Sequence, residues 1–188
     1  MNRLHKWYCG SSQWRKHLQD GILPRVLKGV ALSGNVLEIG PGLGIATEQL
    51  AAGGTPVTVV ELDPALAQRL RHRFAPSRVR VVQGDGTALP FADGSIDIVV
   101  CTTMLHHIPA SSLQDALFAE VRRVLRPGGT FTGSDSVSSL LFRLAHIGDD
   151  MTLVDAAALP QRLEAAGFTE VDVWTHPAVF TFRGRAAA

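Results

Sequence analysis

The sequence contains few cysteines and no long apolar run. Its only cysteines are Cys9 and Cys101, which are too few for a disulfide framework or a cysteine-ligated zinc site. A membrane-spanning helix needs about eighteen or more consecutive apolar residues. Neither such a run nor the apolar segment of a signal peptide is present. We therefore expect a protein of the cytoplasm without a membrane span.

A large excess of charge of either sign is also missing. The formal net charge is +1, whereas a nucleic-acid-binding domain usually carries a strong positive field. One basic cluster exists, but it runs around an expected helix and its exit rather than alternating with stacking aromatic residues. We interpret it as a solvated face and expect no nucleic-acid partner. The cluster consists of Arg69, Arg71, Arg73, Arg78 and Arg80.

The composition is that of an ordinary globular protein, so we expect one domain over residues 1–188, with a helical cover at 1–32 and a core at 33–188. Short apolar runs alternate with segments of helical periodicity. Because parallel neighbours in a sheet need crossover helices, this alternation predicts a doubly wound α/β fold. A turn at His176-Pro177 adds a closing antiparallel hairpin. The expected strands are 36–39, 57–61, 79–82, 96–101, 130–132, 171–174 and 179–182.

Several expected helices have marked ends. In the N-terminal cover, Ser11 or Ser12 can cap one short helix, and Pro24 can open another. Ser111 and Gln114 have the spacing of a capping box at the start of a helix with an apolar stripe. That stripe consists of Leu113, Leu117, Val121 and Val124, and other helices are expected at about 44–53, 64–74, 140–147 and 155–166.

The stretch from Val36 to Gly44 combines a buried strand with a glycine turn. Glycines follow the strand at positions 40, 42 and 44, and glycine allows a backbone to turn sharply and approach a ligand closely. The next helix presents its free N–H groups to whatever lies over the turn. This pattern is typical of a nucleotide-binding turn.

Polar side chains follow the expected strands at their carboxyl ends, where open parallel sheets bind ligands. Glu61 lies about twenty residues after the first glycine, a spacing suited to accepting hydrogen bonds from ribose hydroxyls. Glu38 interrupts the first strand, and a buried carboxylate needs a cation or several N–H donors. Either the ammonium group of a ligand or the neighbouring glycine amides could meet that need. The other polar residues of this rim are Asp85, Thr102, Thr103, Ser134 and Asp135.

A dinucleotide cofactor such as NAD is disfavoured. Its fingerprint, Gly-x-Gly-x-x-Gly/Ala, requires a small residue at position 45. The chain has Ile45 there and carries its third glycine at position 44. The pyrophosphate site is therefore compromised.

Four segments together resemble the class I S-adenosylmethionine-dependent methyltransferases, and within them the type 11 methyltransferases of bacteria. Glu38-Ile-Gly-Pro-Gly-Leu-Gly44 resembles the first motif of the family, E/D-x-G-x-G-x-G, and Val60-Glu-Leu-Asp-Pro64 resembles the acidic second motif. Gly84-Asp-Gly-Thr-Ala-Leu-Pro-Phe91 is similar to the adenine-side loop, and Val124-Leu-Arg-Pro-Gly-Gly129 to the segment before strand five. The resemblance covers roughly residues 34–175. It implies a Rossmann-like, seven-stranded sheet of order 3-2-1-4-5-7-6 with strand 7 antiparallel.

The resemblance implies S-adenosyl-L-methionine as the cofactor, with S-adenosyl-L-homocysteine as the product. Glu61 would bind the ribose and Asp85 the adenine amino group, while the backbone carbonyl of Thr102 would lie near the ammonium group. The full set of implied cofactor-binding residues is Glu38, Gly40, Gly42, Gly44, Glu61, Leu62, Gly84, Asp85, Gly86 and Thr102.

The residues expected on the acceptor side are less sharply defined. His106 and His107 follow the fourth strand on the expected methyl side of the cofactor, and imidazole is suited to act as a general base near neutral pH. Such a pair can instead shape the turn; of the two, we favour His107 for catalysis. Tyr8, Trp14 and His146 are expected in the substrate pocket, although core packing explains the N-terminal aromatic residues equally well. We predict no metal site.

We therefore expect methyl transfer to a small molecule, and the apolar, aromatic-rich covering segments favour a hydrophobic or lipid-like acceptor. A nucleic-acid methyltransferase is disfavoured, because Cys101-Thr-Thr-Met-Leu105 lacks the Asn/Asp-Pro-Pro-Tyr type of sequence with which similar proteins hold a base. The alternative from another class is a cofactor-binding module that acts with a partner subunit.

Overall fold

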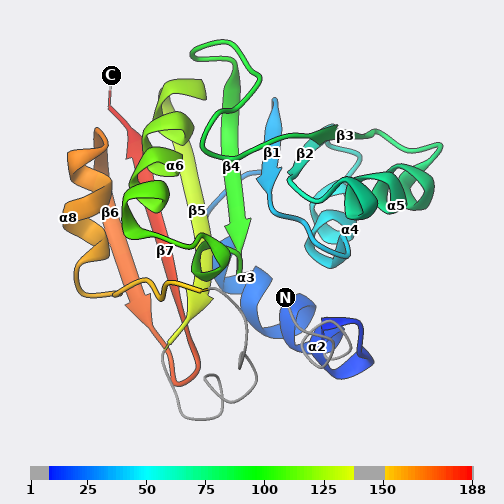
Figure 1. Ribbon diagram of the computed structural model, residues 1–188, viewed down its shortest axis with the longest axis horizontal. Coiled ribbons are helices and arrows are strands. Elements are labelled where there is room, and N and C mark those ends of the chain that lie inside the picture. The colour runs from blue at the N-terminus through cyan, green and yellow to red at the C-terminus, as the bar shows by residue number, and fades with distance from the viewer. Residues whose placement is uncertain (1–8, 138–150, 188) are drawn as a thin grey trace.

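The structure, a computed structural model that describes residues 9–137 and 151–187, is a seven-stranded sheet covered by helices (Figure 1). The strand order is β3-β2-β1-β4-β5-β7-β6. β7 is antiparallel to β5 and β6, whereas the other neighbouring strands are parallel. The order and the hairpin expected from the sequence are confirmed. The strands are β1 (Val36–Ile39), β2 (Val57–Glu61), β3 (Val79–Gln83), β4 (Ile96–Thr102), β5 (Leu125–Ser136), β6 (Phe168–Thr175) and β7 (Val179–Ala186).

Two apolar cores lie against opposite faces of the sheet. Alternate residues of a strand point to opposite faces, and in β1 Val36 belongs to one core while Leu37 and Ile39 belong to the other. The first core includes side chains of α3, α4 and α5, and the second includes side chains of α6 and α8. The helical segments are α2 (Ser12–Lys16), the π-helical turn η1 (His17–Ile22), α3 (Leu23–Val26), α4 (Ile45–Ala51), α5 (Pro64–Phe74), the 3-10 turn η2 (Leu105–His107), α6 (Ser111–Val124) and α8 (Leu159–Ala165).

In the described part of the N-terminal cover, residues 12–26 form one continuous helical segment, so the expectation of two separate helices there is wrong. Ser11 caps its start as expected, because its hydroxyl accepts a hydrogen bond from the Trp14 N–H at 3.1 Å. The chain then passes through η1 into α3 without a break. Pro24 has no N–H to bond to a carbonyl in the preceding turn, and the π-helical turn ends two residues before it, at Ile22. Leu18 and Ile22 of η1 are buried against the core that includes α4.

Two details of α6 and α8 also differ from expectation. Ser111 does not cap α6, because Ala110 holds that position and forms no side-chain cap. Gln114 is fully buried and serves a tertiary role, while Leu113 is 41% exposed and lies outside the apolar stripe. α8 begins later than expected, because Asp155 first closes a turn by accepting from the backbone of Ala157. The helix expected at 140–147 lies outside the described residues.

In the part of the chain that the structure describes, no helix combines the length and apolar character needed to cross a bilayer.

Candidate functional site

The loop between β1 and α4 has a backbone that requires glycine. Gly40, Gly42 and Gly44 adopt φ angles of +69°, +54° and +76°, a region that side chains with a Cβ rarely occupy. At Gly40 a Cβ would also lie 2.2 Å from Cγ of Met104. At Gly42 a Cβ would meet nothing within 4 Å. The loop therefore presents an open, backbone-lined surface to a ligand at the carboxyl end of β1.

Glu61, the last residue of β2, closes over this loop. Its Oε2 accepts a hydrogen bond from the Gly42 N–H at 3.1 Å, and its Oε1 accepts one from the Asp63 N–H at 3.0 Å. The residue is only 7% exposed, and burial raises the pKa of its carboxyl. The next residue, Leu62, is 66% exposed. The sequence placed the glycine turn and the acidic residue on one rim, and the structure brings them into contact.

Glu38 lies beneath the same loop and is 1% exposed. Its Oε2 accepts a hydrogen bond from the Thr47 hydroxyl at 2.5 Å, while Oε1 is buried and has no hydrogen-bond partner among the described residues. Burial raises the pKa of this carboxyl from 4.5 to about 7, and the charge of Glu61 adds to the rise. The partner is thus Thr47 of α4, which the sequence analysis missed, rather than a glycine amide.

The loop after β3 joins the same rim. The Gly84 N–H donates to the Glu61 carbonyl oxygen at 3.0 Å. Asp85 is exposed, and its Oδ1 accepts from the backbone N–H and the hydroxyl of Thr87 at 2.8 and 2.9 Å. At Gly86 a Cβ would lie 2.9 Å from Cδ1 of Leu117, so glycine lets this loop pack closely on α6.

The predicted acceptor-side histidines lie in η2, beyond the end of β4. His106 is 2% exposed, and Asp135 at the end of β5 contacts it through both carboxylate oxygens. The Nδ1 of His106 lies 2.5 Å from Oδ1 of Asp135, and the His106 backbone N–H donates to Oδ2 at 3.0 Å. His107 is half-buried, with its ring centroid 4.2 Å from that of His106. The sequence named both His106 and Asp135 but did not pair them.

Of the other predicted site residues, some lie within the described part of the chain and some lie outside it. Thr102 is buried at the end of β4. Trp14 is half-buried and packs against the core that includes α4, as the core-packing alternative expects. Tyr8 and His146 lie outside the described residues. Within the described ranges, no group of three or more His, Cys, Asp or Glu side chains is arranged to hold a metal ion.

The donors and acceptors of this rim fit a nucleoside that carries a positive charge. Backbone amides and an open surface are offered by the glycine loop. Two carboxylates, Glu38 and Glu61, lie under and beside it, and one oxygen of Glu38 has no hydrogen-bond partner among the described residues. Exposed Leu62 offers an apolar surface for a flat ring.

Comparisons with known proteins agree with this reading of the rim. A family model described as "Methyltransferase domain" matches residues 37–132. The ubiquinone biosynthesis O-methyltransferase of Xanthomonas campestris pv. campestris is 34% identical over 148 residues, which cover 76% of this chain and 61% of that protein. The ribosomal RNA small subunit methyltransferase A of Bordetella petrii is 31% identical over 118 residues, covering 56% and 45%. The chain thus spans about half the length of these curated relatives.

The fold is shared with a solved S-adenosylmethionine-dependent methyltransferase of Aquifex aeolicus. The two superimpose with a TM-score of 0.76 at 16% identity, and the match covers 100% of each chain. The family match extends from β1 into β5 and contains the glycine loop, Glu61 and Asp85. The chain therefore belongs to the methyltransferase-domain family of class I S-adenosylmethionine-dependent methyltransferases.

Proposed function

We propose that the protein transfers the methyl group of S-adenosyl-L-methionine to an apolar, lipid-like small molecule. One observation carries the cofactor assignment: three loops that follow different strands are joined at one rim. The Gly42 N–H bonds to the Glu61 carboxylate at 3.1 Å, and the Gly84 N–H bonds to the Glu61 carbonyl at 3.0 Å. Glu61 therefore lies between the glycine loop and the loop that carries Asp85.

Each of three carboxylates at the rim contacts a different part of the cofactor. Glu38 faces the ammonium group, Glu61 accepts from the ribose hydroxyls, and Asp85 accepts from the adenine amino group. The side-chain hydrogen bonds of Asp85 in the described part of the chain use Oδ1, so Oδ2 is available for that contact. The remaining cofactor-binding residues are Gly40, Gly42, Gly44, Leu62, Gly84, Gly86 and the carbonyl of Thr102.

The protein's main contribution to catalysis is positioning. S-adenosyl-L-methionine, when bound, supplies a methyl group already activated by its positively charged sulfur. Holding an acceptor in line with that group is worth up to about 7–11 kcal/mol. A hydroxyl or carbon acceptor gains a further hundredfold to ten-thousandfold, roughly, from a general base. His106 and His107 are our candidates for that base.

The apolar character of the acceptor is supported by a cavity of about 330 Å³ beyond the end of β5. Asp135, which holds His106, is in register with Phe180 of β7, and directly opposed residues project to the same face of a sheet. Thr152, next to the cavity, donates its backbone N–H to the carbonyl of His106 at 3.0 Å. The cavity is lined by Val137, Leu153, Val154, Asp155, Ala156, Thr175 and Phe180.

Calorimetry tests the cofactor assignment. We expect S-adenosyl-L-methionine to bind and NAD not to bind. Glu61→Ala should abolish binding, because it removes the ribose acceptor and an anchor of the glycine loop. Glu164→Ala, which removes an exposed acid from α8, is the matched control and should bind as the wild type does. Binding of NAD alone, or full binding by Glu61→Ala, would contradict the proposal.

Transfer of labelled methyl from the cofactor into fractionated cell extract tests the acceptor class. We expect label in the lipid or small-molecule fraction. Label confined to RNA would instead favour an activity like that named for the ribosomal RNA relative. Cofactor binding without a labelled product in any fraction would favour a cofactor-binding module that acts with a partner subunit.

A further inference from the structure

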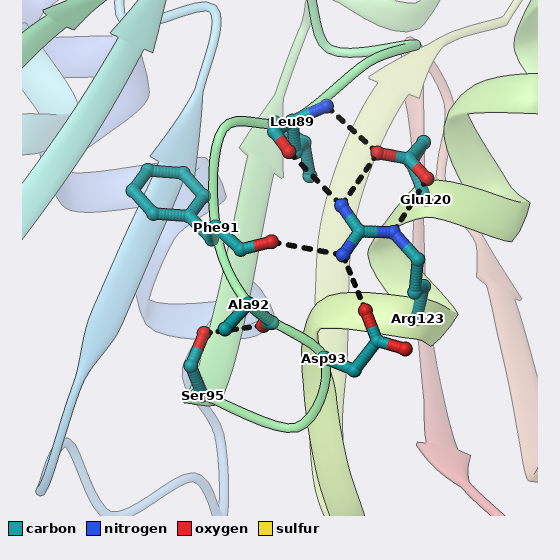
Figure 2. A network of polar contacts seen from close by, with 7 residues as sticks. All are labelled: Leu89, Phe91, Ala92, Asp93, Ser95, Glu120 and Arg123. Atoms are coloured by element: carbon teal, nitrogen blue, oxygen red, sulfur yellow. Dashed lines mark hydrogen bonds and ion pairs between the residues drawn. The ribbon is translucent and has the colours of Figure 1, made fainter.

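A network of polar contacts joins α6 to the loop after β3 (Figure 2). All three guanidinium nitrogens of Arg123 take part. Nη2 donates to the Leu89 carbonyl at 2.9 Å, and Nη1 donates to the Phe91 carbonyl at 2.8 Å and to Asp93 Oδ1 at 2.6 Å. Nε and Nη2 also bond to the two carboxylate oxygens of Glu120, at 2.7 and 2.8 Å. Glu120 of the same helix therefore orients Arg123, which bonds to three residues of the loop.

Glu120 contributes a loop contact of its own. Its Oε2 accepts the Leu89 N–H at 2.7 Å, so the pair fixes both the N–H and the carbonyl of Leu89. The Leu89 side chain is 4% exposed and belongs to the core on the α6 face. The Gly94 N–H donates to the Arg123 carbonyl at 3.0 Å and closes the far end of the loop.

Leu89, which this network holds, lies four positions after Asp85. Hydrogen bonds close the turn between the two residues. The Ala88 N–H donates to the Asp85 carbonyl at 3.1 Å, and Thr87 donates twice to Asp85 Oδ1. On the other side, Gly86 packs on Leu117, one turn of α6 before Glu120. The position of the Asp85 carboxylate therefore depends on α6.

We propose that Glu120 and Arg123 are positioning residues that set the selectivity of the site for adenine by holding the adenine-side loop (residues 84–93). The inference rests on the proposed function, in which Asp85 accepts from the adenine amino group. A carboxylate recognises that amino group only when it is held at hydrogen-bonding distance. A loop free to shift would retain stacking on the ring but lose this recognition.

The effect should be local. Arg123 and Glu120 side chains are 32% and 21% exposed, and ion pairs in contact with solvent add little to global stability. Within the loop only Leu89 is buried, and Phe91 is half-buried against the same core. The loop should therefore open at a lower free energy than the whole fold. Removing the guanidinium should therefore move the loop before it unfolds the sheet.

The test compares binding of S-adenosyl-L-homocysteine with binding of S-inosyl-L-homocysteine, in which an oxo group replaces the adenine amino group. The wild type should prefer the adenine form. Arg123→Ala should reduce that preference about tenfold, the equivalent of one charge-assisted hydrogen bond. Arg123→Lys keeps the charge but not the fork geometry and should lose most of the preference as well.

Arg122→Ala is the matched control. This neighbouring arginine donates to the carbonyls of Gly167 and Ala187, at 3.0 and 2.8 Å. It therefore holds the residue before β6 and the residue after β7, and not the adenine-side loop. It should leave the adenine preference unchanged, with thermal unfolding measured alongside. Hydrogen exchange should rise in residues 84–93 of the Arg123 variants and not in Arg122→Ala.

Three results would overturn the inference in distinguishable ways. An unchanged adenine preference in both Arg123 variants would show that the loop holds its position without them. Equal losses of affinity for the two nucleosides would show that the network has a purely structural role. If the wild type bound neither nucleoside, the proposed function itself would fail.

Discussion

Replacing Glu38 with glutamine should remove a pH-dependent cost from the folded protein. The Glu38 carboxyl is buried and has a pKa of about 7 in the fold, against 4.5 for an exposed carboxyl. Glutamine has nearly the same shape and can still accept the Thr47 hydroxyl bond, but it never ionises. The variant and the wild type should therefore differ most at a pH at which Glu38 is charged.

Proton linkage gives the sign and the size of the change in unfolding free energy with pH. Because the pKa is higher in the fold, the unfolded chain loses this proton first, and stability falls as the pH rises from 4.5 towards about 7. A difference of about 2.5 units at about 1.4 kcal/mol per unit corresponds to about 3 kcal/mol. Below pH 4.5 both states are protonated and the cost disappears, whereas above about pH 7 it is constant.

Urea unfolding at several pH values between 4.5 and 8 measures this difference. Relative to Glu38→Gln, the wild type should lose about 3 kcal/mol of unfolding free energy across that range. Subtracting the two curves removes the contribution of every group that they share. Glu48→Gln is the control, because Glu48 is paired with Arg15 and Arg73 and its pKa is lowered. Parallel curves for the wild type and Glu38→Gln would refute the reasoning.

The remaining predictions concern buried residues of β5, and urea unfolding measures each. Phe131→Ala removes a fully buried ring that packs against three other phenylalanines, so we expect a loss of about 3–5 kcal/mol; a loss below about 1 kcal/mol would contradict that packing. Gly133→Ala would place a Cβ 2.1 Å from the Cys101 carbonyl oxygen of the neighbouring strand, so it should destabilise the sheet strongly, and a neutral result would contradict the strand register. Asp135→Ala removes the buried carboxylate that holds His106 and should cost about 3–5 kcal/mol. Asp135→Asn should cost less, because its amide oxygen can still accept one of the two backbone N–H groups, of His106 or Ser136, that the carboxylate accepts; equal losses would show that hydrogen bonding does not matter there.

Features that depend on the backbone were predictable from the sequence. The turn after β1 needs left-handed φ angles, and only glycine adopts them without strain, so Gly40, Gly42 and Gly44 indicate the turn directly. Asp63 caps α5 and Pro64 opens it, and these are residue types preferred at those positions, so the start of the helix expected at 64–74 is confirmed. Alternation of strands and helices then fixes a parallel sheet and brings the strand ends to one rim.

Features that depend on tertiary pairing were not predictable. Ser111 and Gln114 have the spacing of a capping box, yet the Gln114 amide donates to the carbonyls of Leu105 and Thr152, at 3.1 and 2.8 Å. Burying an amide with full hydrogen bonding outweighs a cap that is worth about 1 kcal/mol. The pairing of His106 with Asp135 has the same origin, because it requires β4 and β5 to be neighbours and η2 to fold back towards the end of β5.

In the proposed function, the cofactor side and the acceptor side of the site lie in different parts of the chain. The family match stops at residue 132, after the glycine loop, Glu61, Asp85 and both histidines of η2. The residues that line the apolar cavity begin at Val137 and continue to Phe180, beyond that match. Relatives named for ubiquinone biosynthesis and for ribosomal RNA match this chain over 148 and 118 residues. Selectivity for the acceptor should consequently follow substitutions between 137 and 180, and cofactor affinity should follow substitutions before residue 132.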